Sequence, residues 1–402
     1  MNQRSYDILI AGGGMAGASL ALALRGYRGR IAVLDQQFAT QAPAPLDVRS
    51  TALNAGSRRF FESLGLWQRV SEFAAPIRHI HVSDRGHFGA ARLHAEEYAL
   101  SALGYVAENH HLHALLAESL AAADNIASVD ATVTGVGDDD SGDSLKVFAG
   151  DRAFQTRLLV VAAGARAALA ARLGLRSRER SYAQAAIVAN VMVARPREGV
   201  AFERFTETGP VALLPLGDAR YAVVMTVAEA QRDTLLRCSD CDFLQRLQAA
   251  FGWRLGRFKR VGQRAAFPLS LVQTQCQIAR RSVLVGNAAR TLHPVAGQGL
   301  NLALRDVAEL ARLLHSERGM RDPGCAALLE EFAVRRRADQ RSTTATTDLL
   351  VKTFGSRFAP VVVARNAGLI AMDLLPPLRH WFARRSMGLG ARSPMTGLGG
   401  TP

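Results

Sequence analysis

The sequence from Asp7 to Leu24 reads Asp-Ile-Leu-Ile-Ala-Gly-Gly-Gly-Met-Ala-Gly-Ala-Ser-Leu-Ala-Leu-Ala-Leu. A short apolar run, typical of a buried strand, leads into three glycines that fit the pattern G-x-G-x-x-G: Gly12, Gly14 and Gly17. Ala and Leu, which favour a helix, dominate the residues that follow. The pattern predicts a strand, a tight turn and a helix.

A second apolar run, Ile31–Leu34, follows this helix and ends in Asp35. In a dinucleotide site the glycines permit the tight turn and the close approach of a pyrophosphate, and an acid after the second strand can bond a ribose hydroxyl. The alternative is a glycine-rich turn that binds nothing. Because the strand, helix, second strand and acid occur together, we predict a Rossmann-like unit that binds a dinucleotide.

A second glycine-rich loop lies near residue 298. The stretch from Val283 to Asp306 starts as an apolar strand-like run, breaks at Gly286, and passes through a Pro/Gly loop into a helix. A loop that enters a helix presents free backbone N–H groups. Gly297 and Gly299 lack a Cβ, so a flat ring can lie close to the backbone. An ordinary strand–loop–helix connection is the alternative.

Composition limits the classes of partner. The chain has 402 residues, 49% of them apolar, and a net charge of +14, which favours anionic ligands or surfaces. We find no nucleic-acid-binding module. Cys238 and Cys241 form a single C-x-x-C without a second pair, so we expect no metal or redox site there. His79, His81, His87 and His94 are irregularly spaced with no clustered acid, and we predict no bound metal.

The middle of the chain changes character. Short β-like runs with tight turns between residues 183 and 227 suggest a mixed or antiparallel sheet. We predict an α/β fold with a discontinuous dinucleotide-binding domain (1–75, 100–180 and 270–330) and an inserted second domain (76–99 and 181–269). Helices follow over 331–387, and 388–402 is a tail without predicted structure.

Two segments leave alternatives open. Asp47–Leu53 is predicted to enter a helix, with Arg49 just before it, where the guanidinium is either a phosphate ligand or a surface group. Helices are predicted at Cys325–Gln340, Ala345–Phe354 and Val361–Leu375, the last of them amphipathic. It either packs on the body of the protein or docks on a membrane or partner helix. We find neither a signal peptide nor an apolar run long enough to span a bilayer.

Taken together, these segments resemble the class A flavoprotein aromatic hydroxylases, of p-hydroxybenzoate hydroxylase type. Within them, the chain is most similar to the branch that hydroxylates ubiquinone precursors, and there to the 2-octaprenyl-6-methoxyphenol hydroxylases. The resemblance covers about Asp7 to Met387. It rests chiefly on Gly286–Asp306, with support from Ala201–Phe205, Gly209–Leu216 and Gly104–Asn109.

The resemblance implies roles for individual residues. Gly12, Gly14 and Gly17 would hold the FAD pyrophosphate and Asp35 the ribose, with Arg49 and Asn109 approaching from neighbouring elements. Asn287 stands where most of the wider family has Asp. The flavin ring would be wrapped by Pro294, Gly297, Gln298, Gly299, Leu300 and Asn301. The family's second motif usually reads Gly-Ala-Asp-Gly, whereas Ala163 replaces the Asp here, which puts efficient reduction by a nicotinamide in doubt.

The implied activity is hydroxylation of a polyprenylated phenol, with NADPH or NADH as reductant and O₂ activated as a flavin C4a-hydroperoxide. Pro294 and His293 would lie at the reacting centre. His293 either relays a proton, because imidazole titrates near neutral pH, or is structural. Arg204 faces either the substrate pocket or solvent. The expected location is cytoplasmic, with attachment to the inner membrane face or to other ubiquinone-biosynthesis proteins as an open alternative. A hydroxylase of soluble aromatics and a non-catalytic scaffolding flavoprotein are the competing functions.

Overall fold

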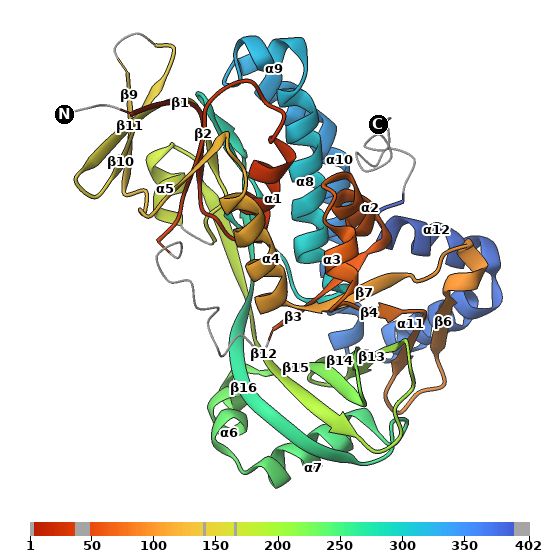
Figure 1. The fold of residues 1–402 in the computed structure, drawn as a ribbon. Coiled ribbons are helices and arrows are strands. Elements are labelled where there is room, and N and C mark those ends of the chain that lie inside the picture. Colours follow the sequence, from red (N-terminus) through yellow and green to blue (C-terminus); the bar gives the residue numbers. More distant parts are fainter. Residues whose placement is uncertain (1–3, 37–48, 140–141, 165–166, 390–402) are drawn as a thin grey trace.

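The computed structural model describes residues 4–36, 49–139, 142–164 and 167–389 (Figure 1). Its first sheet has a parallel centre in the order β8-β2-β1-β11-β18. These strands are Ile126–Val129, Ile31–Leu34, Arg4–Ala11, Arg152–Val161 and Ser282–Leu284. Strand β17 (Ile278–Ala279) adds an antiparallel edge, and the hairpin of β9 (Gly135–Asp138) and β10 (Leu145–Ala149) pairs with β11.

Helices cover one face of this sheet. They are α1 (Met15–Ala23), α2 (Ala55–Ser63), α4 (Asn109–Ala121), α8 (Gln298–Leu314) and α10 (Ala326–Gly355). Successive side chains of a strand point to opposite faces, so Ile8 and Ile10 join the helices in one core. Leu9 packs in a second core on the other face, with β10 and α5 (Ala167–Arg172). Burial on both faces explains why β1 reads as a continuous apolar run.

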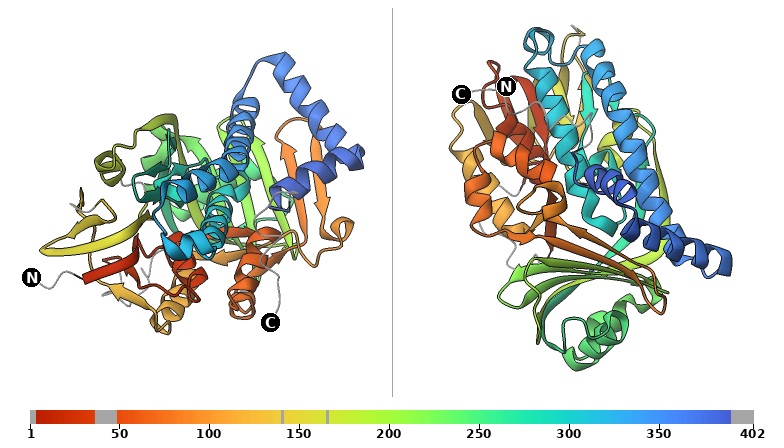
Figure 2. Two further views of the ribbon diagram at one scale, coloured as in Figure 1. Left: turned by 90° about the horizontal axis from the view of Figure 1, so that it is seen from above. Right: turned by 90° about the vertical axis from the view of Figure 1, so that its right-hand side faces the viewer.

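The second sheet has eight strands in the order β19-β16-β12-β15-β14-β13-β5-β6. They are Arg290–Thr291, Phe258–Thr274, Ser177–Val193, Arg220–Ala228, Gly209–Gly217, Val200–Thr206, His79–Asp84 and Ala90–His94. Pairing is antiparallel except between β13 and β5. One face packs on α7 (Asp240–Phe251), with α6 (Arg232–Arg237) beside it (Figure 2).

A three-stranded sheet, β3-β7-β4, lies between the two large sheets (Figure 1). It consists of Ser50–Asn54, Gly104–Glu108 and Ala75–Ile77. The prediction that Asp47–Leu53 enters a helix is therefore wrong over its described part: β3 pairs with β7, and α2 begins at Ala55. The remaining short elements are α3 (Trp67–Ser71), α9 (Glu317–Arg321), η1 (Ala95–Tyr98), η2 (Glu229–Gln231), η3 (Gly286–Ala288) and η4 (Val295–Gly297).

The C-terminal part is helical but is divided differently from the prediction. Helix α10 runs unbroken for 30 residues, where two helices were expected. Its Arg336 donates to Asp306 of α8 at 2.6 Å, and both side chains are about 2% exposed, so a buried ion pair joins the two helices. Helices α11 (Ala359–Leu374) and α12 (Pro376–Ser386) follow; α12 lies within the predicted helical region 331–387, although no separate helix was predicted there. Pro376, which cannot continue the preceding helix, lies at their junction.

The α/β class, the Rossmann-like centre and the added mixed sheet are thus confirmed. The predicted residue bounds of the domains stay predictions. Most of the tail 388–402 lies outside the described residues.

Candidate active site

A cavity of about 880 Å³ lies where the two large sheets meet. Its walls come from the β1–α1 turn, β3, the loop around residue 297, the strands of the second sheet, and α10 to α12. It brings together most of the predicted site residues: Gly14, Arg49, Asn287, Pro294, Gly297, Gln298, Gly299, Leu300 and Asn301. Segments almost 300 residues apart in the chain therefore share one site.

The β1–α1 turn is built around glycine. Gly12 has φ +113°, and a Cβ there would lie 2.5 Å from the backbone nitrogen of Ala163. At Gly17 a Cβ would lie 1.9 Å from the Gly12 carbonyl oxygen. The helix and the turn can therefore pack this closely only because residue 17 has no side chain. Gly14 begins α1 without a side-chain cap and faces the cavity. The free N–H groups of this helix start, together with its dipole, form an anion-binding end.

Asp35 follows β2 and closes the same turn from the side. Its Oδ2 accepts a hydrogen bond from the Gly13 N–H at 2.6 Å. Asp35, Gly12 and Ala163 line a small second hollow next to the main cavity. Ala163, which stands where the resemblance led us to expect Asp, thus lies beside the carboxylate predicted to bind the ribose.

The second glycine loop is fixed by Asn301. Its amide oxygen accepts from the Asn54 N–H at 2.9 Å and from the Ser57 hydroxyl at 2.7 Å. Its amide nitrogen donates to the carbonyls of Ala52 at 2.8 Å and Gly297 at 2.7 Å. The side chain of Asn301 therefore ties α8 to β3 and α2, and it holds Gly297 in its left-handed conformation, φ +58°.

Two other predicted residues differ in position. Arg49 lines the cavity at the start of β3, with its guanidinium 5.3 Å from the centre of the Phe267 ring. Asn109 is buried and does not line the cavity. Its oxygen accepts from the Thr51 hydroxyl at 2.7 Å, and its N–H donates to the Arg49 carbonyl at 3.0 Å. Asn109 thus positions the strand that carries Arg49.

His293 lies behind the loop, not in the cavity wall. Its side chain is 1% exposed, and its Nδ1 accepts from the Val295 N–H at 3.2 Å. Burial lowers the pKa of His293 to about 4. The imidazole is therefore neutral at pH 7, and the argument for a proton relay, titration near neutral pH, does not apply to it. The structural alternative is favoured.

Glu203 replaces Arg204 as the charged residue of β13 that faces the cavity. Ala201, Glu203 and Phe205 line the cavity, whereas Arg204 does not and points toward the α7 side, near Gly252. The sequence left both orientations of Arg204 open, because alternation in a strand shows two faces without saying which one is inside. The available signal was a carboxylate in the middle of an apolar strand.

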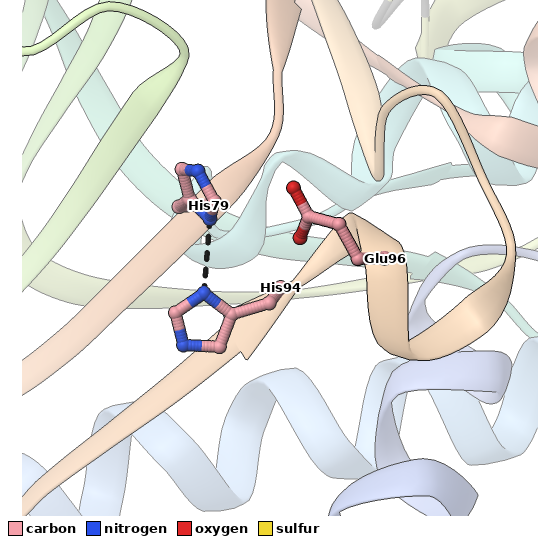
Figure 3. A group of neighbouring side chains, drawn as sticks. All are labelled: His79, His94 and Glu96. Carbon is pink, nitrogen blue, oxygen red and sulfur yellow. Dashed lines mark hydrogen bonds between the residues drawn. The ribbon is translucent and has the colours of Figure 1, made fainter.

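Two of the four histidines expected to be scattered are neighbours. His79 and His94 are paired across β5 and β6, with their Nδ1 atoms 2.9 Å apart, and Glu96 lies beside them (Figure 3). The expectation that no acid accompanies these histidines was wrong. The alternating Ile80 and Leu93 line the cavity, and His79 and His94 do not. Whether the group holds a metal is not tested, and the prediction of no metal stays a prediction.

The cavity fits a dinucleotide with a flat ring. At Gly14, Gly164 and Gly299, which all line it, an added Cβ would meet no atom within 4 Å. Backbone without side chains thus borders open space at both glycine loops. A parallel sheet with such a helix start, a second glycine loop, and an added sheet over an apolar cavity define the class of FAD-dependent aromatic-ring monooxygenases.

Comparison with known proteins places the chain within this class. A family model described as FAD binding domain matches residues 5–346, and the chain belongs to this family. FAD is therefore the cofactor of this protein. The chain is 36% identical to the ubiquinone hydroxylase UbiL of Rhodospirillum rubrum, over 96% of this chain and 91% of that protein. It is 28% identical to 3-demethoxyubiquinol 3-hydroxylase of Escherichia coli, over 97% of this chain and 100% of that protein.

Solved structures agree on the fold. The p-nitrophenol 4-monooxygenase PnpA of Pseudomonas putida superposes with a TM-score of 0.77 over 96% of this chain and 99% of that chain, at 16% identity.

Proposed function

We propose that this protein is an FAD-dependent monooxygenase that hydroxylates a polyprenylated phenol in ubiquinone biosynthesis, with NADPH or NADH and O₂ as co-substrates. The observation that carries the proposal is the apolar cavity that continues from the two glycine loops to the second sheet and the C-terminal helices. Its far part is lined by aliphatic and aromatic side chains: Ile80, Val82, Leu93, Leu214, Leu350, Phe354, Leu369 and Met372. Such walls suit an aromatic ring with a long hydrocarbon tail.

The proposed division of labour follows the cavity. Gly12, Gly14 and Gly17 would accommodate the diphosphate at the start of α1, and Asp35 would bond the ribose. The backbone from Pro294 to Asn301, with Asn287, would lie against the flavin ring, and Arg49 would approach from β3. When bound, FAD supplies the redox and oxygen chemistry, and the chain orients the phenol and keeps water from the reacting atoms.

Helices α11 and α12 supply a route for a lipid substrate. Leu369, Met372, Phe382 and Ala383 of these helices line the cavity on their inner side. Apolar residues on their outer side are largely exposed: Val363 69%, Leu374 70%, Leu375 53% and Trp381 60%. We propose that this helix pair docks on the surface of an anionic bilayer, with Arg384 and Arg385 toward the lipid headgroups.

The finding on membrane spans is compatible with surface docking. Among the described residues, no single helix is long and apolar enough to cross a bilayer, and α11 and α12 pass that test only as a pair bent by 96°. The two helices meet at a sharp bend (Figure 2). A pair with this shape can lie in the interface while its inner side still borders the cavity. The polyprenyl tail would then leave the membrane between these helices.

The competing functions are tested by the same assay. Purified protein is expected to retain FAD and to oxidise NAD(P)H faster when a short-chain prenylphenol is added, with a hydroxylated ring as product by mass spectrometry. Absence of phenol-stimulated NAD(P)H oxidation would contradict the proposal, and absence of any NAD(P)H oxidation would support a non-catalytic role, for which Ala163 is the one sequence feature. Equal turnover of phenols without a tail would favour a hydroxylase of soluble aromatics. Lipid extracts of a deletion strain should accumulate one prenylated phenol, which identifies the ring position.

Membrane docking has its own test. The variant Leu374→Ser/Leu375→Ser/Trp381→Ser is expected to lose most of its co-sedimentation with phosphatidylglycerol vesicles at low salt, because it removes the apolar contact. Trp253→Ser is the matched control, since Trp253 is 71% exposed but lies beyond α7, away from the helix pair. Wild-type protein that fails to sediment at both low and high salt would defeat direct docking and leave partner proteins as the occupant of this surface.

A further inference from the structure

Glu203 occupies a specific place in the wall of the cavity. Strand β13 pairs Glu203 with Val82 of β5 and with Ala212 of β14, and Ala212 pairs in turn with Val224 of β15. All four side chains line the cavity. They form one row across four neighbouring strands, in which a single carboxyl group stands among two valines and an alanine.

The carboxyl group of Glu203 is not engaged by any other group in the part of the chain that the structure describes. Among the described residues it has no hydrogen-bond or ion-pair partner, and the other charged residues in the cavity wall are Arg49 and Arg365. Arg365 is already engaged: it donates to Asp84 at 2.8 Å and to the carbonyls of Thr353, Phe354 and Ser356. Burial alone raises the pKa of Glu203 to about 7. The residue is half-buried, because its carboxyl faces the cavity. An ionised carboxyl in such an apolar wall is costly unless a ligand pairs with it.

We propose that Glu203 is the residue that binds the phenolic hydroxyl of the substrate and takes its proton during hydroxylation. This inference rests on the proposed function. The carboxylate accepts the hydroxyl proton, and the electron pair of the broken O–H bond stays on the phenol oxygen and enriches the ring. The ring carbon then bonds an OH group derived from O₂ and releases its own hydrogen as a proton, which is taken up by the second oxygen atom as that atom leaves as water. Glu203 returns its proton to the phenol oxygen, while NAD(P)H supplies the two electrons that reduce the second oxygen atom to water.

The other candidates are less suited to this role. His293 is neutral and lies outside the cavity wall, and Arg204 faces away. Among the cavity-lining residues that the structure describes, Glu203 is the one proton acceptor that titrates between acid and neutral pH. A base with such a pKa can be ionised at pH 7 to 8 and still hold a proton transiently.

The test compares Glu203→Gln with the wild-type holoenzyme. With a geranyl-substituted methoxyphenol as substrate, kcat is expected to fall by roughly 10²- to 10⁴-fold, as for loss of a general base, while FAD content stays unchanged. The acidic limb of the pH profile should disappear in the variant. Anaerobic binding of the phenol should give the red-shifted phenolate spectrum with wild type and not with the variant. A ring-fluorinated phenol, which ionises at lower pH, should recover much of the lost rate.

Glu207→Gln is the matched control, because Glu207 follows the same strand but its side chain is 79% exposed. It should leave rate and pH profile unchanged. If wild type hydroxylates the phenol and Glu203→Gln shows the same kcat, pH profile and phenolate spectrum, the assignment of Glu203 is overturned and the proposed function stands. If wild type itself hydroxylates no phenol, the proposed function fails.

Discussion

The two ends of the cavity are built by different means. At the cofactor end, Gly12, Gly17 and Gly297 shape the backbone directly, and side chains such as Asn301 serve to fix that backbone. At the substrate end, a row of side chains from four strands and the inner faces of α11 and α12 make the wall. Backbone sites recur as sequence motifs because only glycine fits them. Walls of side chains leave no such motif.

This difference has a functional counterpart. A backbone site suits a cofactor that is the same in every relative, while a wall of exchangeable side chains can be adapted to a new ring or tail. The cofactor end should therefore tolerate few substitutions, and the substrate end should trade specificity without losing FAD. The following three experiments test that contrast, together with the docking and Glu203 experiments above.

The largest effect is expected at the anchor of α8, the helix that carries the second glycine loop. Asp306→Ala should lower the free energy of unfolding by about 3 to 4 kcal/mol, because the buried Arg336 guanidinium then keeps only Asp339 as an acid partner and Gln340 loses its acceptor. Chemical denaturation monitors the change. The control is Glu331→Ala on α10, whose ion pair with Arg335 is 33% and 50% exposed and should be worth less than about 1 kcal/mol. Equal losses in both variants would mean that the buried pair does not anchor the cofactor end.

A pH-dependent effect is expected at His293, which is buried behind the second glycine loop. Its pKa is lowered from 6.5 to about 4 in the folded protein, so the unfolded chain binds the proton first as the pH falls. Stability due to this group is complete above pH 6.5 and is lost between pH 6.5 and 4, by up to about 3 kcal/mol. His293→Gln should flatten the pH dependence of unfolding in that window. His315→Gln, at an exposed site, should not. An unchanged slope in His293→Gln would contradict the burial argument.

The smallest loss of stability, with a clear effect on the cofactor, is expected within the first glycine turn. Gly17→Ala places a methyl group 1.9 Å from the Gly12 carbonyl oxygen, which should cost about 1 to 3 kcal/mol and release FAD. Gly14→Ala adds the same methyl group where no atom lies within 4 Å, so its stability should match wild type. Flavin absorbance after gel filtration and the unfolding midpoint distinguish them. If Gly17→Ala keeps full flavin content, the close packing of α1 against the Gly12 carbonyl is not essential to the site.

The sequence was informative where local geometry restricts the residue type. Both glycine loops, the acid after β2, and the strands of the inserted sheet follow from patterns within about 20 residues, and the structure has these elements where they were predicted. Long-range packing was not accessible in the same way. The unbroken α10 depends on its contacts with α8, and the meeting of His79, His94 and Glu96 depends on the register of β5 against β6.

The choice between Glu203 and Arg204 shows the limit most clearly. Both belong to one strand, and only the position of β13 between β5 and β14 decides which of them faces inward. A shift of one residue in that register would exchange them. No local pattern contains this information.

The long strand β12 leaves the first half of the molecule and the long strand β16 returns to it, and the two strands are paired side by side. Ser177 is paired with Thr274, and pairing continues to Val193 and Phe258. The segment between these strands therefore leaves and rejoins the first half at one place, while its strand β13 also pairs with β5 from an earlier part of the chain. The paired strands β12 and β16 thus form one attachment point. Evolution or an engineer can exchange the strand layer there, and with it the substrate, while the flavin half keeps its fold.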